Sequence, residues 1–263
     1  MASEVLFIFV ILFLALAPPL VYLIWVRDTE ICRREPYSAL LRAFLFGGTV
    51  SIAISYFGES LIMNLLYSSG SPLARGFWNF QPFDPTLETL LLAVIVAPII
   101  EESAKALGVL NSYPRLLEVE DGMVYGAAVG LGFAAVENIL YLFSALVGGV
   151  ELLLMTAALR AVTSTILHAS STAIVGYGIA LSKFSRLRGV EKSWLPYLLI
   201  AILLHASFNL FAILGVLFQS NADLFSLIGL FLSFILAATA FTIMRQKIKR
   251  LDRSVPCIPE QSP

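Results

Sequence analysis

Long apolar segments constrain the fold of this chain more than any other feature of its sequence. Seven of them are long enough to cross a membrane, because about 20 mostly apolar residues in a helix span the hydrocarbon core of a bilayer. Hydrophobic residues make up 59% of the 263 positions and charged residues 13%, against about 25% charged in soluble domains. We therefore predict an all-α, polytopic integral membrane helix bundle with about seven to eight transmembrane helices. The predicted spans cover residues 5–26, 39–66, 86–110, 122–147, 151–181, 194–218 and 223–244.

The basic residues predict the orientation of the bundle. Lys and Arg are concentrated after the first, third, fifth and seventh spans, whereas the alternate loops contain hardly any. Because cytoplasmic loops are enriched in Lys and Arg, we place the N-terminus outside the cell membrane and the C-terminus in the cytoplasm. Cys32 and Cys257 then both lie on the cytoplasmic side, where a disulfide is not expected. We predict a transmembrane domain over residues 1–250 and a disordered cytoplasmic tail over 251–263.

Three details stay open on the sequence alone. The fifth predicted span is unusually long, and it is either one helix or a short outer helix followed by a true span. Arg160 within it is either an interfacial residue or the partner of a buried acid. The aromatic residues of the loop 67–85 either anchor at the outer membrane interface or border a substrate entrance. The net charge of −1 does not indicate a nucleic-acid partner.

Two adjacent acids and a lysine interrupt the third predicted span. Glu101, Glu102 and Lys105 lie in an otherwise apolar run, where a charged side chain costs about 2.5–3.5 kcal/mol or more to insert. In a helix, Glu101 and Lys105 lie one turn apart and can pair, while Glu102 points about 100° away toward a different neighbour. Pro98 lacks an amide hydrogen and predicts a kink just before the acids. The cluster is either an ion pair tolerated near a helix end or part of a functional site.

Three further polar clusters lie within predicted spans, namely Glu137 with Asn138, His168, and His205 with Asn209. The two histidines are the only ones in the chain. At a rise of 1.5 Å per residue, the acidic and imidazole groups lie roughly 13–22 Å from the predicted cytoplasmic ends of their helices. A lone intramembrane histidine is commonly a packing residue that is hydrogen-bonded. Four clusters at similar depth instead favour one shared polar pocket near the middle of the membrane.

The side chains of these clusters are suited to hydrolysis of an amide bond. A glutamate can act as a general base that takes a proton from water. Two histidines and two glutamates also suit a Zn²⁺ ion, and a neutral His or Asn can stabilise an oxyanion. No Cys or Ser stands in a pattern typical of a covalent nucleophile. We therefore predict hydrolysis in a cavity inside the membrane.

The chain resembles the PrsW family of intramembrane proteases, in the wider group that includes CAAX prenyl proteases and bacteriocin-processing homologues. The resemblance spans most of the chain, and the combination of its motifs is specific. The matching stretches are Ala-Pro-Ile-Ile-Glu-Glu-Ser-Ala-Lys at 97–105, Asp-Gly-Met-Val-Tyr-Gly at 121–126, Gly-Leu-Gly-Phe at 130–133, Glu-Asn-Ile-Leu-Tyr at 137–141, and the histidine blocks at 168 and 205–209.

The resemblance implies roles for these residues. Glu101 and Glu102 look like the paired acids of the family, with Glu101 as the general base. Glu137 stands where the CAAX prenyl proteases have a histidine, so their mechanism does not transfer directly. This departure favours a metal site, possible for Zn²⁺ or another divalent ion, with the expected ligands Glu101, Glu137, His168 and His205.

Further implications concern the oxyanion, the supporting residues and the substrate. His168 and His205 look like the essential histidines, and Asn209 like the oxyanion partner beside His205. Lys105, Asn138 and Arg160 are expected to support the catalytic side chains. The resemblance also implies substrates embedded in the lipid bilayer, such as single-pass proteins or anti-sigma factors in regulatory cascades.

Two alternatives from other functional classes are also consistent with the sequence. Intramembrane acids and histidines build proton relays, so the chain could be a proton- or ion-coupled transporter in which Glu59 of the second span joins the path. It could also be a scaffold that binds a membrane partner without cleaving it. Ion flux without peptide cleavage would indicate the transporter, and binding that survives Glu101→Gln would indicate the scaffold.

Overall fold

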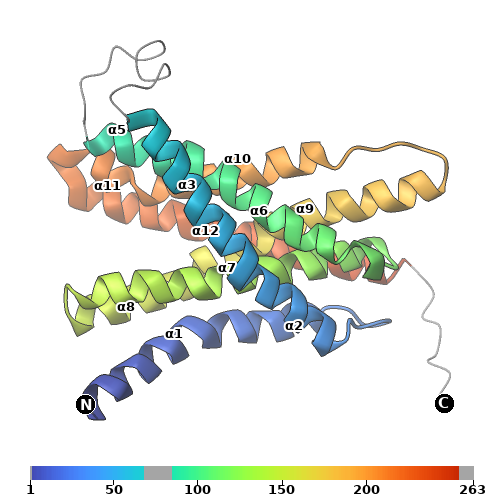
Figure 1. The fold of residues 1–263 in the computed structure, drawn as a ribbon, viewed down its shortest axis with the longest axis horizontal. Coiled ribbons are helices and arrows are strands. Elements are labelled where there is room, and N and C mark those ends of the chain that lie inside the picture. The colour runs from blue at the N-terminus through green and yellow to red at the C-terminus, as the bar shows by residue number, and fades with distance from the viewer. Residues whose placement is uncertain (1, 68–84, 255–263) are drawn as a thin grey trace.

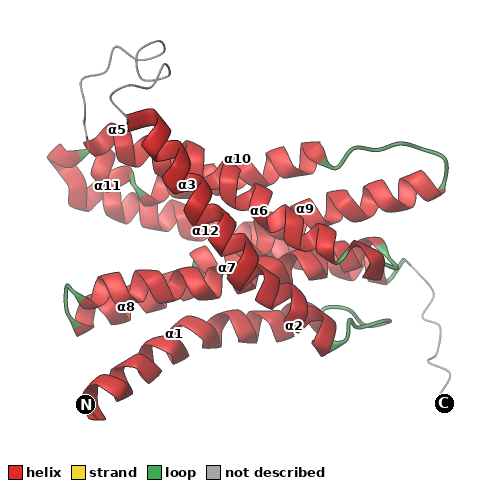
Figure 2. Ribbon diagram, in the orientation of Figure 1, coloured by secondary structure: helices red, strands yellow, loops and turns green. Residues whose placement is uncertain are grey.

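The computed structural model describes residues 2–67 and 85–254, and within these ranges the chain forms helices and no strands (Figure 2). The predicted all-α membrane bundle is confirmed. In the described part of the chain, six segments are long and apolar enough to cross a membrane. They are Phe7–Arg27, Tyr37–Leu66, Val119–Leu146, Val150–Leu187, Leu195–Ala212 and Gln219–Asp252.

Figure 1 shows the order of the described helices along the chain. The first half of the chain contains α1 (Ala2–Arg27), α2 (Tyr37–Phe46), η1 (Gly47–Ser51), α3 (Ile52–Tyr67), α5 (Pro85–Leu90), η2 (Leu91–Val96), α6 (Ala97–Asn111) and η3 (Tyr113–Arg115). The second half contains α7 (Val119–Leu146), α8 (Val150–Val162), α9 (Ser164–Leu187), α10 (Leu195–Ala212), α11 (Leu214–Leu217), η4 (Gln219–Asn221) and α12 (Ala222–Asp252). In Figure 1, α1 begins at the opposite end of the bundle from the end of α12.

The third predicted span is formed by α5, η2 and α6, and it is not among the six uniformly apolar segments. Its middle part, η2, is a π-helical turn that ends directly before α6. Pro98 is the second residue of α6, where its missing amide hydrogen costs little. A π-helical turn, a form that is common at functional sites, therefore precedes the helix that carries the two acids. The kink predicted from Pro98 stays a prediction.

The fifth predicted span consists of two helices, which settles the question left open by the sequence. Thr163 separates α8 from α9 with a non-helical backbone, at φ −121° and ψ −83°. The first helix is short, with 13 residues, and the second has 24. This break lies five residues before His168 and thus determines where the helix that carries this histidine begins.

Helix α7 runs through the middle of the bundle (Figure 1) and packs very closely against α9. Glycines spaced four residues apart on α7 lie at this contact. A Cβ atom added to Gly126 would lie 2.4 Å from the carbonyl oxygen of Thr172, and one added to Gly130 would lie 2.1 Å from that of His168. Only glycine allows backbones to approach this closely, so Gly130 helps to set the position of His168.

The loop between α1 and α2 is held by buried carboxylates from distant parts of the chain. Asp252, at the end of α12, accepts hydrogen bonds from the backbone amides of Ile31 (3.0 Å) and Cys32 (3.1 Å). Glu35 accepts a hydrogen bond of 2.5 Å from the hydroxyl of Tyr125 on α7. The loop therefore joins the beginning, middle and end of the bundle.

The structure contradicts the expectation that Cys32 forms no disulfide, because Cys32 is disulfide-bonded. The expectation rested on the cytoplasmic placement of this loop, and Asp252 brings the end of α12 against the loop that contains Cys32. Cys257 and most of the predicted tail lie outside the described residues, as do the aromatic residues of the loop 68–84.

The loop also predicts a pH-dependent stability. Glu30 is fully buried, with Oε1 unpartnered and Oε2 accepting the amide hydrogen of Glu35 at 3.2 Å. Burial raises the pKa of Glu30 from 4.5 to about 9. The folded state therefore retains a proton that the unfolded chain releases above about pH 4.5, so stability falls as the pH rises from there toward 9. We expect Glu30→Gln to reduce this slope in thermal melts between pH 6 and 9.

Glu191→Gln is the matched control, because Glu191 is exposed. It should retain the slope of the parent protein. A slope for Glu30→Gln equal to that of the parent would show that Glu30 is not protonated in the folded loop.

Candidate functional site

A cavity of about 500 Å³ lies inside the bundle, and the predicted polar residues converge on it from five helices. It is lined by residues of α3, η2, α6, α7, α8, α9 and α10. The predicted site residues that line it are Glu101, Glu137, Arg160, His168, His205 and Asn209. Helices that are far apart in the sequence therefore contribute to one polar pocket, as the estimated depths suggested.

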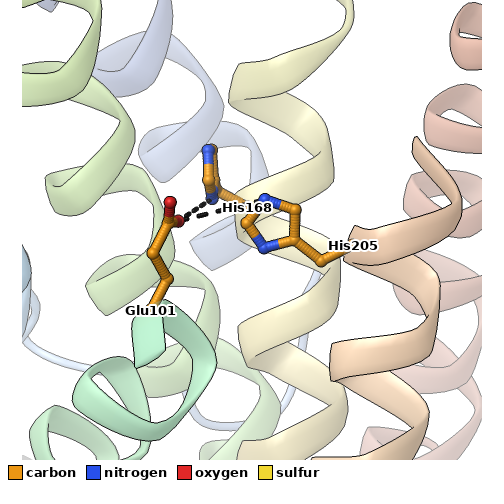
Figure 3. Close-up of side chains that lie close together, drawn as sticks. All are labelled: Glu101, His168 and His205. Atoms are coloured by element: carbon orange, nitrogen blue, oxygen red, sulfur yellow. Dashed lines mark ion pairs between the residues drawn. The ribbon is translucent and has the colours of Figure 1, made fainter. Parts of the chain in front are cut away.

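Glu101, His168 and His205 point toward one another from α6, α9 and α10 (Figure 3). The Oε2 atom of Glu101 lies 3.9 Å from Nδ1 of His168 and 3.9 Å from Nε2 of His205. One ligand atom from each side chain lies within 4.8 Å of the others, and all three residues are buried. Among the described residues, this is the one group of three or more that could hold a metal ion.

Each histidine directs its second ring nitrogen at another carboxylate. Nδ1 of His205 lies 2.9 Å from Oε1 of Glu102, and Nε2 of His168 lies 2.9 Å from Oε2 of Glu137. Such pairs fix the ring orientation and the tautomer of a histidine. Ser171 also donates a hydrogen bond of 2.9 Å to Oε1 of Glu102. Ser171 belongs to the polar cluster that begins at His168 in the sequence, but no role was predicted for it.

Lys105 is fully buried at the centre of this group. Its Nζ lies 2.7 Å from Oε1 of Glu102, 3.4 Å from Oε2 of Glu101 and 2.9 Å from Nδ1 of His168. The prediction that Lys105 pairs with Glu101 while Glu102 faces elsewhere was therefore incomplete, because positions i+3 and i+4 are both within reach on a helix. An ammonium can only donate, so Nδ1 of His168 accepts, and Nε2 carries the hydrogen toward Glu137.

Arg160 pairs with Glu137, a part-buried acid of the cavity wall, and is therefore not only an interfacial residue. Its guanidinium donates hydrogen bonds to Oε2 of Glu137 and, at 2.7 Å, to Oδ1 of Asn138. It also lies 3.9 Å from the ring centroid of Tyr141. Asn138 in turn donates to the hydroxyl of Thr165 at 3.1 Å. Tyr141 belongs to the stretch 137–141 that resembles the family, but no role was predicted for it.

Glu137 is thus placed differently from the other expected metal ligands. Its carboxylate faces Arg160 and the outer nitrogen of His168, whereas Glu101 faces the inner nitrogen. Glu137 is consequently not part of the group that could hold an ion. A helical periodicity places Glu137 and His168 at similar depth but cannot tell which ring nitrogen meets which carboxylate.

Asn209 lines the cavity one turn after His205 on α10. Its Nδ2 donates a hydrogen bond of 2.7 Å to the backbone carbonyl of Ala93 in the π-helical turn η2. This bond fixes the side chain at the cavity wall and leaves one of its two amide hydrogens free to donate. Glu59 of α3, assigned above to a transport path, lines the same cavity.

Comparison with known proteins gives one consistent result. The sequence profile described as PrsW family intramembrane metalloprotease matches residues 35–241 of this chain. The chain is 31% identical over 200 residues to the protein named Protease PrsW of Clostridioides difficile (strain 630), covering 74% of this chain and 76% of that protein. It is 28% identical over 202 residues to Protease PrsW of Bacillus subtilis (strain 168), covering 76% and 82%. No solved structure matches the chain significantly.

The Arg160 contacts predict a test of the cavity wall. Arg160→Met leaves the part-buried carboxylate of Glu137 without its cation, and a hydrogen bond to a charged group contributes about 1.5–3 kcal/mol. We expect a loss of this order in unfolding free energy, measured by SDS titration in mixed micelles. Adding Glu137→Gln should recover part of it. Arg188→Met, at an exposed position, is the control, and an equal effect of both arginine substitutions would contradict the structural role of Arg160.

Proposed function

The chain belongs to the PrsW family of intramembrane metalloproteases, and from that premise we propose that it hydrolyses peptide bonds of membrane-embedded proteins in the cavity around Glu101. The observation that carries this proposal is the convergence of Glu101, His168 and His205 from three helices in one buried cavity. Membership of a protease family argues against the transporter and the scaffold.

Glu101 is the general base in this mechanism. Its carboxylate takes a proton from a water molecule in the cavity, and the water oxygen attacks the carbonyl carbon of the substrate. When the C–N bond breaks, the protonated Glu101 returns the proton to the leaving amine nitrogen. This role is supported by its position between both histidines, while Glu102 is committed to Lys105, Ser171 and His205.

Asn209 stabilises the oxyanion of the tetrahedral intermediate with the amide hydrogen that Ala93 does not use. His205 lies one helical turn before Asn209 on α10, lines the same cavity and supports this role. Glu102 and Glu137 are positioning residues, because each holds one histidine ring through the nitrogen that faces away from Glu101. Lys105 and Arg160 in turn hold these two carboxylates.

The donor set also fits a divalent metal ion such as Zn²⁺. Catalytic zinc sites use three protein ligands, often two His and one Glu, and keep a fourth position open. With an ion bound, Glu101, His168 and His205 would hold it, with Glu102 and Glu137 behind the histidines as orienting carboxylates. Glu101 would then be a ligand, so this is an alternative to its role as the general base. When bound, the ion supplies Lewis acidity that polarises a carbonyl and makes water more acidic. Lys105 faces the same lone pair of His168 that the ion would use.

The protein is a multi-pass membrane protein, and we infer its orientation and substrate class from the residues and the family. Concentration of Lys and Arg on alternate loops supports an outer N-terminus and a cytoplasmic C-terminus in the cell membrane. The buried position of the cavity supports a substrate that enters from the bilayer. A single-pass protein of the anti-sigma-factor type is the proposed substrate.

The first test is cleavage of a single-pass membrane protein by the purified chain in liposomes. General acid–base catalysis contributes about 10²–10⁴-fold to a rate, so Glu101→Gln and His205→Ala should each reduce cleavage at least about 100-fold. Ser207→Ala is the matched control on α10, because Ser207 only bonds the backbone of its own helix. Cleavage by Glu101→Gln at the rate of the parent would exclude Glu101 as the base.

The second test is metal content after loading with Zn²⁺ or Co²⁺. We expect about one equivalent in the parent and less than about a tenth in His168→Ala. Lys105→Met should bind the ion at least about tenfold more tightly, because a nearby positive charge and a competitor for His168 are removed.

Glu59→Gln is the control for metal content, since Glu59 lines the cavity but is not in the donor group. It should bind the ion like the parent. Less than about a tenth of an equivalent in the loaded parent would argue for acid–base catalysis without a metal.

A further inference from the structure

A second cavity lies between α9, α10 and α12, away from the candidate active site. Its volume is about 420 Å³, and its lining shares no residue with the cavity around Glu101. Most of its wall is apolar, with Leu236 and Ile243 from α12, Ile200 and Leu204 from α10, and Met123 of α7. Ile200 and Ile243 are half exposed, so the cavity opens as a groove on the outer face of the bundle.

The walls of the groove are apolar, and side chains that carry polar groups border one of its ends. Lys247 of α12 lies with Nζ 5.1 Å from the ring centroid of Tyr177, and the ring of Tyr177 lies 5.4 Å from that of Tyr197. All three side chains line the cavity. Within the described part of the chain, Lys247 makes no ion pair and neither tyrosine hydroxyl makes a hydrogen bond. One end of the groove is thus bordered by a cation without a carboxylate partner and by two hydroxyl groups without hydrogen-bond partners among the described residues.

The groove has the length of one bilayer leaflet. The lining of α12 extends from Leu236 to Lys247, and eleven helical residues rise about 16 Å. Half of a hydrocarbon core of about 30 Å is about 15 Å. Lys247 is the lining residue nearest to the end of α12, and Tyr197 is the one nearest to the start of α10. These two helix ends belong to the side of the bundle that carries the basic loops, so the polar end lies at the membrane interface and the apolar end in the acyl region.

We propose that this groove binds an anionic phospholipid, with its phosphate on Lys247 and the two tyrosine hydroxyls and one acyl chain along the apolar wall. The charge favours this occupant, because a phosphate supplies the acceptors and the negative charge that the three donors lack. A transmembrane helix is not suited to the groove. A helix is about 10–12 Å wide, whereas a cavity of about 420 Å³ over about 16 Å has a mean cross-section of only about 26 Å².

Native mass spectrometry of the full chain in detergent tests the proposal with two lipids of identical acyl chains. The parent should retain phosphatidylglycerol about fivefold more than phosphatidylcholine, since one lysine near the surface is worth about this factor. Lys247→Gln should remove the preference, and Lys247→Arg should keep it. Lys192→Gln is the control, because Lys192 is exposed on the same side of the bundle and lines none of the cavities described here.

A second variant fills the apolar part. Ala240→Phe places a large side chain in the groove. It should lower the retention of phosphatidylglycerol and of phosphatidylcholine to the same extent. The thermal stability of the lipid-free protein checks that the variant is folded. Equal retention of the two lipids by the parent would overturn the proposal. An equal loss in Lys192→Gln and Lys247→Gln would do the same, because it would trace the preference to general surface charge.

Discussion

The neutralisation of one buried ammonium group holds the centre of this structure together. Lys105 has no exposed surface, and an uncompensated charge in such surroundings costs several kcal/mol. Its three hydrogens meet Glu101, Glu102 and His168, which uses every donor that a lysine has. Because Glu102 also contacts His205, the same charge connects α6 with α9 and α10. The polar pocket and the packing of these helices therefore depend on one another.

The sequence was sufficient for the features that follow from length, periodicity and depth. The apolar runs predicted the helical membrane bundle, and the position of each polar residue within its run predicted that Glu101, His168 and His205 would meet. Both arguments use only the helical rise and the thickness of a membrane. The resemblance to a protease family rested on the same residues and is supported by the match over residues 35–241.

The sequence was insufficient where several partners lie within reach of one side chain. Lys105 can reach either acid by helical spacing, and the shorter contact with Glu102 depends on α9 and α10, which supply further partners for Glu102. The placement of Glu137 behind His168 depends on Arg160, whose own position follows from the break at Thr163. Such choices are made by tertiary packing, and a single helical pattern does not contain them.

The contact between α7 and α9 shows that a residue can be important for the site without being chemically reactive. Gly130 has no side chain to take part in any reaction, yet its missing Cβ is the space that the carbonyl of His168 occupies. The imidazole can lie between Glu101 and Glu137 only because the backbone beneath it is this close to α7. In this architecture, a position without a side chain on one helix determines where a reactive group on another helix lies.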